Sequence, residues 1–225
     1  MEVIEQTSSH LSFDKTPKRM NKNDRERQII DQAIAFFAKH GFEGQIRELT
    51  QELGIKHTLL YHYFPTKQDL IERVYQEVFE GRWKVEWEEI LESKNLSPEN
   101  KLIEFYVDYA HTILTYDFVR ILIFSGLSDH VISDRFFKIL SEKLIPKLIK
   151  VTRQHWNISS KKKPSSREIE HLMGLHGGIF YLGVRRFIYG QHFYQSKEEI
   201  SDREIICDRV RTYLMTANHI FHKDI

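Results

Sequence analysis

The sequence predicts an all-α protein of about nine helices. Apolar residues recur at helical spacing from Arg25 onward, as at Ile30, Ala33, Ile34 and Phe37. No segment shows the sustained apolar–polar alternation or the turn pairs that mark strands and hairpins. Glycine (10 residues) and proline (5 residues) are sparse, and several of them, such as Gly41, Gly54 and Pro65, fall between the periodic segments, where they end helices.

Length and composition fit one globular domain, or a small one joined to a larger one. The chain has 225 residues, 41% of them hydrophobic and 29% charged, and a formal net charge of +1. Wholesale disorder is therefore excluded, and any basic binding site must be a local patch. Cys207 is the only cysteine, which excludes an intrachain disulfide and fits a reducing compartment. With no secretion signal and no apolar stretch long enough to span a bilayer, we expect a cytoplasmic protein without a membrane partner.

The first third of the chain predicts a flexible arm and four helices. Residues 1–21 are polar and aperiodic and carry Lys15, Lys18 and Arg19, so we expect them to form the arm. Glycines and a proline separate the first helices, and a capping box, Thr66 with Asp69, begins the fourth. The expected helices are 25–40, 46–53, 57–64 and 66–91, the last bent at Gly81.

Five further helices are expected in the rest of the chain. Ser97 precedes a proline at the first helical position of one, and capping boxes that start at Ser165 and Ser201 open the last two. Pro146 should bend the helix expected over 131–154. The expected spans are 98–114, 118–127, 131–154, 165–189 and 201–222.

Residues 45–64 have the pattern of a helix-turn-helix. The turn between two closely crossing helices favours a glycine, and Gly54 lies there. Leu60 and Phe64 are four residues apart and should face the core. The other side chains of the turn and the second helix are then free to enter a major groove. They are Lys56, His57, Thr58, Leu59, Tyr61 and His62.

This region resembles the N-terminal domain of the tetracycline-repressor (TetR) family of bacterial transcriptional regulators. The resemblance rests on an ordered set spread over about 50 residues: Ala33, Phe37, Gly41-Phe42, Ile46, Leu49, Gly54-Ile55, Leu60-Tyr61, Tyr63-Phe64, Thr66-Lys67 and Leu70. It implies a DNA-binding domain over 22–82 and a helical effector-binding and dimerisation domain over 83–225. It also implies a homodimer that a small effector releases from operator DNA.

The same resemblance implies which residues face DNA. Tyr61 and Arg47 are expected to reach phosphates, as are Thr66 and Lys67 together with the amides at the start of the fourth helix. His57, Thr58 and His62 are expected at base edges, and Leu59 at a thymine methyl. The family usually has a Thr/Ser pair before the second helix, where this chain has Gly44-Gln45. Each position also has a plain alternative: Lys67 as a solvated lysine and His62 as an exposed imidazole.

Local charge agrees with a nucleic-acid site in this region. Residues 15–67 hold ten Lys/Arg and six Asp/Glu, a net of +4, whereas residues 68–80 hold four acids and one Arg, a net of −3. The basic stretch therefore ends where the DNA-binding unit is expected to end.

The larger domain is rich in aromatic residues, which in the family line an effector pocket. Aromatic residues at helical spacing also build ordinary cores. The candidates for the pocket are Tyr106, Tyr109, Phe124, Met173, His176 and Phe180. For a dimer interface on the last helix, the candidates are Ile205, Ile206, Val210, Leu214, Ala217 and Phe221, although this stripe would serve an intrachain core equally well.

No cofactor, metal or catalytic group is expected. His171 and His176 are five residues apart and lie on different helix faces, and no His-Glu-x-x-His is present. The main hypothesis is a DNA-binding repressor. An activator, a regulator of the same fold that answers to a protein or a metal, and an all-α enzyme remain as alternatives.

Overall fold

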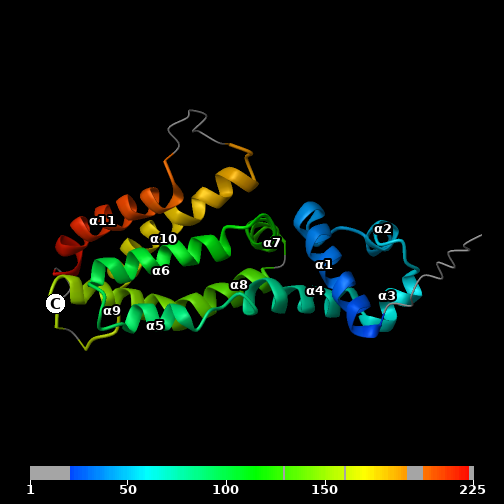
Figure 1. Cartoon of the computed structure of the whole chain (residues 1–225), viewed down its shortest axis with the longest axis horizontal. Coiled ribbons are helices and arrows are strands. Elements are labelled where there is room, and N and C mark those ends of the chain that lie inside the picture. Colours follow the sequence, from blue (N-terminus) through cyan, green and yellow to red (C-terminus); the bar gives the residue numbers. More distant parts are fainter. Residues whose placement is uncertain (1–20, 129, 160, 192–199, 223–225) are drawn as a thin grey trace, which may run out of the picture.

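The computed structural model describes residues 21–128, 130–159, 161–191 and 200–222, and all regular secondary structure in them is helical (Figure 1). The predicted all-α class is thereby confirmed. The helices are α1 (Lys22–His40), α2 (Ile46–Glu52), α3 (His57–Tyr63), α4 (Lys67–Tyr75), η1 (Gln76–Glu80), α5 (Glu86–Glu92), α6 (Pro98–Ile113), α7 (Tyr116–Gly126), α8 (Val131–Ile139), η2 (Leu140–Leu144), α9 (Ile145–His155), α10 (Ser166–Phe187) and α11 (Asp202–Phe221). Because α4 passes directly into η1, and α8 through η2 into α9, the described segments join into ten continuous helices.

The helix α1 begins earlier than the sequence periodicity predicted. The Asn21 side chain accepts a hydrogen bond from the amide of Asp24 at 2.8 Å and so caps the helix before Lys22. Apolar periodicity marks the buried face of a helix but not its polar first turn, which explains the three-residue difference from Arg25. Apart from Asn21, the expected N-terminal arm lies outside the described residues.

The expected helix 66–91 is two helices, which accounts for the extra one. The first ends at Glu80, where the Gly81 amide donates to the carbonyl of Gln76. The Arg82 side chain then turns away to bind the Asp117 carboxylate and the Thr115 hydroxyl at the start of α7. Burial acts to raise the pKa of Asp117, but the bonds from Arg82 and Thr115 outweigh it and hold that pKa below its usual value.

The long helix expected over 131–154 is interrupted, as predicted, next to Pro146. Residues Leu140–Leu144 form the wider π turns of η2, and α9 follows with the proline in its first turn. A proline donates no amide hydrogen bond, so the preceding turn widens where the ladder is broken.

Both capping boxes predicted for the last two helices are present. At the start of α10, Ser165 and Glu168 bond reciprocally, and the buried Glu168 carboxylate also receives two bonds of 2.7 Å from Arg153 of α9. At the start of α11, Ser201 and Glu204 form the same arrangement. The Glu168 side chain therefore has two roles: it caps the start of α10, and its ion pair with Arg153 fixes α10 to α9.

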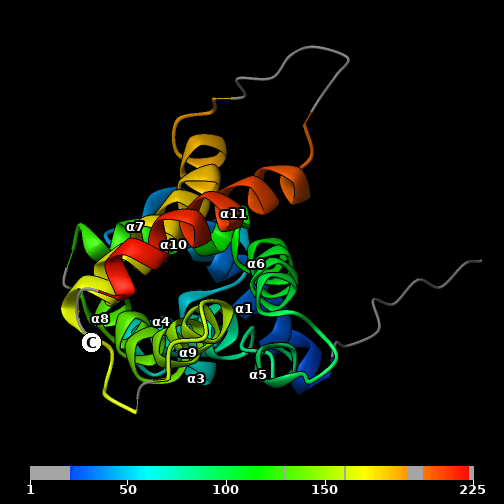
Figure 2. The ribbon, with the colours of Figure 1, turned by 90° about the vertical axis from the view of Figure 1, so that its left-hand side faces the viewer.

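The stripe of α11 that was a candidate dimer interface faces into its own chain. Ile206, Val210, Leu214, Ala217 and Phe221 are all at most 2% exposed and belong to the apolar core. They pack where α11 contacts α6 and α10 (Figure 2). The expectation of a dimer interface along this stripe is therefore wrong, and the alternative of an intrachain core is correct. An apolar stripe in the sequence predicts that a helix face is buried, but not whether its own chain or a second copy buries it. Ile205 is half-buried beside the same core.

Arg120 of α7 joins the N-terminal helices to the larger bundle. Its guanidinium donates to the carbonyls of Ala38 and Lys39, at the end of α1, and to the carbonyl of Phe187, at the end of α10. A cation at a helix C-terminus is favoured by the unpaired carbonyls there. Figure 1 shows α7 beside α1 at this junction, with α2 and α3 farther out at one end of the molecule.

Candidate DNA-binding surface and effector pocket

The turn between α2 and α3 is held by a Schellman motif. The Gly54 amide donates to the carbonyl of Gln51 at 3.1 Å, and the Ile55 amide donates to that of Thr50 at 3.0 Å. Gly54 has a φ of +63°, the left-handed region, and a Cβ added to it would meet no atom within 4 Å. Backbone conformation, and not tight helix crossing, therefore requires the glycine.

The helix α3 is anchored on one side and open on the other. Leu60 is fully buried and Phe64 is 6% exposed, as predicted for the inward face. Tyr61 is 40% exposed, and its ring lies 5.9 Å from that of His57, one turn earlier on the outer face. The other candidate groove residues, Lys56, Thr58, Leu59 and His62, are exposed or, for Leu59, half-buried.

The start of α4 flanks this surface. Thr66 accepts from the Asp69 amide at 3.0 Å, and its own amide and hydroxyl both donate to the Asp69 carboxylate. The Thr66 hydroxyl is therefore used within the capping box, so Thr66 positions the helix and has no hydrogen left for a phosphate. Lys67 is half-buried beside it, and Arg47, on α2, is exposed.

The residues Gly44 and Gln45 before α2 have distinct structural roles. A Cβ on Gly44 would come within 2.6 Å and 2.9 Å of ring atoms of Phe36, which is 1% exposed, so no larger residue fits there without a shift. Gln45 occupies the N-cap position of α2, and its side chain makes no capping hydrogen bond. The helix thus starts without the cap that Ser or Thr would supply.

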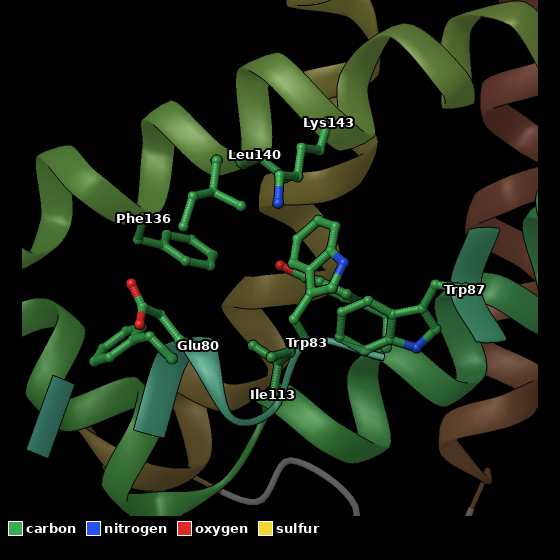
Figure 3. A pocket seen from close by; sticks show the side chains of 10 residues that line it. Glu80, Trp83, Trp87, Ile113, Phe136, Leu140 and Lys143 are labelled. Atoms are coloured by element: carbon green, nitrogen blue, oxygen red, sulfur yellow. The ribbon is translucent and has the colours of Figure 1, made fainter. Parts of the chain in front are cut away.

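The larger domain holds a cavity of about 330 Å³ (Figure 3). Its walls come from η1, the segment after it, α5, α6, α8 and η2. The lining residues are Phe79, Glu80, Trp83, Trp87, Tyr109, Ile113, Phe136, Ile139, Leu140 and Lys143. Five of them are aromatic, and a cavity mainly of apolar side chains with a few polar groups is typical of a small-molecule site.

Of the six residues expected to line a pocket, Tyr109 lines this cavity. Tyr106 is fully buried in the core, and Phe124 lies against Gly41 at the end of α1, where an added Cβ would touch its ring. Met173 and Phe180 pack at the edge of the core. These four do not line the cavity, because helical spacing places a residue on a face but does not say whether a void adjoins it.

His176 lies behind the pocket wall. It is 6% exposed, and its Nε2 is 3.2 Å from the Tyr109 hydroxyl. Burial disfavours the charged imidazolium and lowers the pKa of His176 to about 4. His176 is thus a neutral partner of a pocket residue.

Most of the residues that line the cavity were not predicted as pocket residues from the sequence. The larger domain is rich in aromatic residues, among them Trp83, Trp87 and Phe136. Nothing in the sequence distinguishes these three from the aromatic residues of the core. Lys143 follows Ile139 and Leu140 by about one helical turn, so these three side chains share one face of the helix. This apolar pair with a lysine beside it was the sequence signal that could have indicated the cavity wall.

A guanidinium connects the pocket to the helix that enters the N-terminal domain. Arg135 of α8 bonds Glu72 at 2.6 Å and Glu80 at 3.2 Å, and lies 3.8 Å from the ring centroid of Tyr75. Because α4 and η1 are continuous, Lys67 lies at one end of this element and Glu80 at the other. The pocket and the candidate DNA surface therefore share one continuous helical element.

A shallow groove runs between the outer faces of α10 and α11. It is lined by His171, Gly174, Leu175, Gly178, Asp208, Arg209, Thr212, Tyr213 and Thr216. Two large apolar side chains on these helices are exposed, Tyr181 at 49% and Met215 at 76%.

Two other features are absent from the described residues. Among the described residues, no three His, Cys, Asp or Glu side chains are grouped as metal ligands would be. Of the helices that the structure describes, none has the length and apolar character that a bilayer crossing requires.

Comparison with known proteins identifies the N-terminal domain. Residues 29–74 match the sequence model of "Bacterial regulatory proteins, tetR family". This part of the chain is a TetR-family domain. No curated protein matches the sequence.

Solved structures show that the likeness extends to the whole fold. A TetR-like regulator from Rhodococcus sp. RHA1 aligns with a TM-score of 0.64 at 15% identity, over 88% of this chain and 98% of its own. A transcriptional regulator from Pseudomonas aeruginosa PAO1 aligns at 0.62 and 13% identity, over 92% and 96%. The ketosteroid regulator KstR2 of Mycobacterium tuberculosis aligns at 0.60 and 14% identity, over 87% and 95%. The chain therefore shares the overall fold of these regulators.

Proposed function

We propose that the protein is a homodimeric repressor that binds operator DNA through α3 and is released by a small effector in the aromatic cavity. The observation that carries this proposal is the outer face of α3. It exposes His57, Thr58, Tyr61 and His62 on a domain of the TetR family, while Leu60 holds the opposite face in the core. In helix-turn-helix proteins the second helix presents such a face to the major groove.

Phosphate contacts in this proposal come from Tyr61 on that face, from Arg47 on α2 and from Lys67 at the start of α4. Base contacts come from His57, Thr58 and His62, since their side chains are short or planar and exposed on α3. Such a regulator acts in the cytoplasm, where the DNA lies.

The dimer contact is proposed on the outer faces of α10 and α11. Gly174 and Gly177 are exposed on α10, and an added Cβ at either would meet no atom of its own chain within 4 Å. Small residues beside the exposed Tyr181 and Met215 would let a second copy approach closely and bury apolar surface. Two copies would then form a four-helix contact.

Effector control is proposed to act through α4. An effector in the cavity touches Phe79 and Glu80 of η1, and Arg135 holds Glu80 and Glu72 on that same element. An effector that prefers one position of this element shifts the population of dimers away from the spacing that fits successive major grooves, roughly 34 Å. By linkage, operator DNA then weakens effector binding by the same factor.

The DNA site is tested by selecting bound duplexes from a random pool and measuring the affinity of variants at several salt concentrations. Lys67→Ala should weaken binding to all sequences and lower the salt slope by about 1, because one phosphate contact is lost. His57→Ala should mainly change the preferred sequence. Lys94→Ala, an exposed lysine of the larger domain, is the control and should change neither. An unchanged salt slope in Lys67→Ala would remove Lys67 from the site.

The dimer contact is tested by sedimentation. Met215→Glu should give monomers, since a buried unpaired charge opposes association. Val85→Glu is the matched control, because Val85 is 68% exposed and lies outside the proposed contact. Dissociation by both variants, or by neither, would contradict this location of the interface.

A further inference from the structure

We infer that the effector of the cavity is an organic anion: a compact apolar body that carries one carboxylate or similar group, held at Lys143. This inference rests on the proposed function of the cavity. It follows from the shape of the cavity, from its aromatic walls and from a lysine in its wall that has no ion-pair partner among the described residues.

The walls select a flat or aliphatic body. Trp83 and Trp87 meet edge to face with ring centroids 5.5 Å apart, and Trp87 lies 5.3 Å from Tyr109. Phe136 faces them across the cavity (Figure 3). At about 330 Å³, the space suits a ligand of roughly two fused rings or a short branched chain.

Two charged side chains line the cavity, and their states differ. The Glu80 carboxylate is paired with Arg135 at 3.2 Å, and it shares that guanidinium with Glu72 at 2.6 Å. The Lys143 ammonium has neither an ion pair nor a hydrogen bond within the described residues. Of the two charged side chains in the cavity wall, Lys143 is therefore the one without an oppositely charged partner in the described part of the chain.

Lys143 is exposed to solvent, and its ammonium also lies beside the aromatic wall of the cavity. Its Nζ lies 5.7 Å from the ring centroid of Trp83, and Figure 3 shows the side chain pointing toward that indole. The neighbouring Lys147, one turn later, is instead held by Glu88 at 2.5 Å and Glu92 at 3.0 Å. Of these two lysines, Lys143 alone has its charge directed at the aromatic wall, where a bound ring would place a carboxylate within its reach.

The test uses two fluorescent probes that differ in charge. 8-Anilinonaphthalene-1-sulfonate is an anion, and N-phenyl-1-naphthylamine is its neutral counterpart. Both should be excited by energy transfer from the tryptophans of the cavity. We expect the anion to bind about fivefold more tightly than the neutral probe, a ratio suited to one partly exposed charge contact.

Variants of Lys143 separate charge from packing. Lys143→Met should weaken binding of the anion about fivefold and leave the neutral probe unchanged, whereas Lys143→Arg should retain the preference. Lys138→Met is the matched control, because Lys138 is an exposed lysine of α8 that does not line the cavity. Circular dichroism and thermal unfolding establish that each variant is folded.

A further variant distinguishes failure of this inference from failure of the proposed pocket. Trp83→Leu should weaken binding of both probes, because it removes an aromatic wall. If Trp83→Leu acts but Lys143→Met changes neither probe, the anion inference is wrong and the pocket stands. If Trp83→Leu changes neither probe, the cavity is not the binding site and the proposed pocket fails as well.

Discussion

The buried His176 should make the stability of the protein depend on pH in a defined window. Its pKa is about 4 in the folded chain, against an ordinary value near 6.5, because burial disfavours the imidazolium. Between these values the unfolded chain binds a proton that the folded chain does not. The free energy of unfolding therefore falls as the pH falls through this window, and the contribution is fully present above pH 6.5.

The size of the effect follows from the two pKa values. The linkage relation gives a loss of ~2 kcal/mol between pH 7 and pH 5, and about 3 kcal/mol over the whole window. The range from pH 7 to 5 lies mostly above the titration of ordinary carboxylates, so His176 should dominate the difference between variants.

The assay is urea unfolding of the wild type and of His176→Gln at pH 7, 6 and 5. Glutamine does not titrate and can still bond the Tyr109 hydroxyl, which keeps the wall of the cavity. We expect the stability gap between the two proteins to shift by ~2 kcal/mol toward the variant as the pH falls from 7 to 5. Parallel curves for the two proteins would show that His176 is not held neutral by burial, and would refute the reasoning.

Further predictions concern the helix-turn-helix and the α9–α10 contact, each measured by chemical unfolding. Gly44→Ala should cost about 1–3 kcal/mol because its Cβ overlaps a buried ring; a cost near zero would mean that the ring moves freely. Gly54→Asn should cost well under the ~1 kcal/mol or more of Gly54→Val, since asparagine tolerates a positive φ; equal costs would show that backbone conformation is not what matters there. Glu168→Gln should cost ~3 kcal/mol, because the guanidinium of Arg153 loses its buried counter-charge; a loss below 1 kcal/mol would show that solvent replaces the pair. Gln45→Ser should gain ~0.5–1 kcal/mol by supplying the missing N-cap of α2; a destabilised variant would contradict that account.

Local signals predicted the helices well. Thr66, Ser165 and Ser201 each begin a helix with a capping box, and Pro146 follows a break, because these effects act within one turn of the chain. The bend expected at Gly81 is a complete break, and its extent was not predicted; Arg82 there bonds Asp117, 35 residues away. Periodicity cannot report such a contact.

The residues of the candidate DNA-binding surface were predicted better from the sequence than those of the cavity. The inward face of α3 was predicted correctly, because one turn of spacing places Leu60 and Phe64 together. The cavity was largely missed, since a void arises from how six parts of the chain pack together. Phe124 shows the difficulty: it is aromatic and half-buried, yet it lies against Gly41 at the end of α1.

Arg120 gives the junction between the two ends of the molecule a mechanical consequence. The N-terminal helices are held at two separate places, by the continuous α4–η1 element and by the guanidinium that grips the end of α1. A body fastened at two points does not swing freely about one of them. Reorientation of the N-terminal helices requires the hydrogen bonds from Arg120 to the end of α1 to break. A compound whose binding energy does not offset the loss of these bonds would occupy the cavity without changing the affinity for DNA.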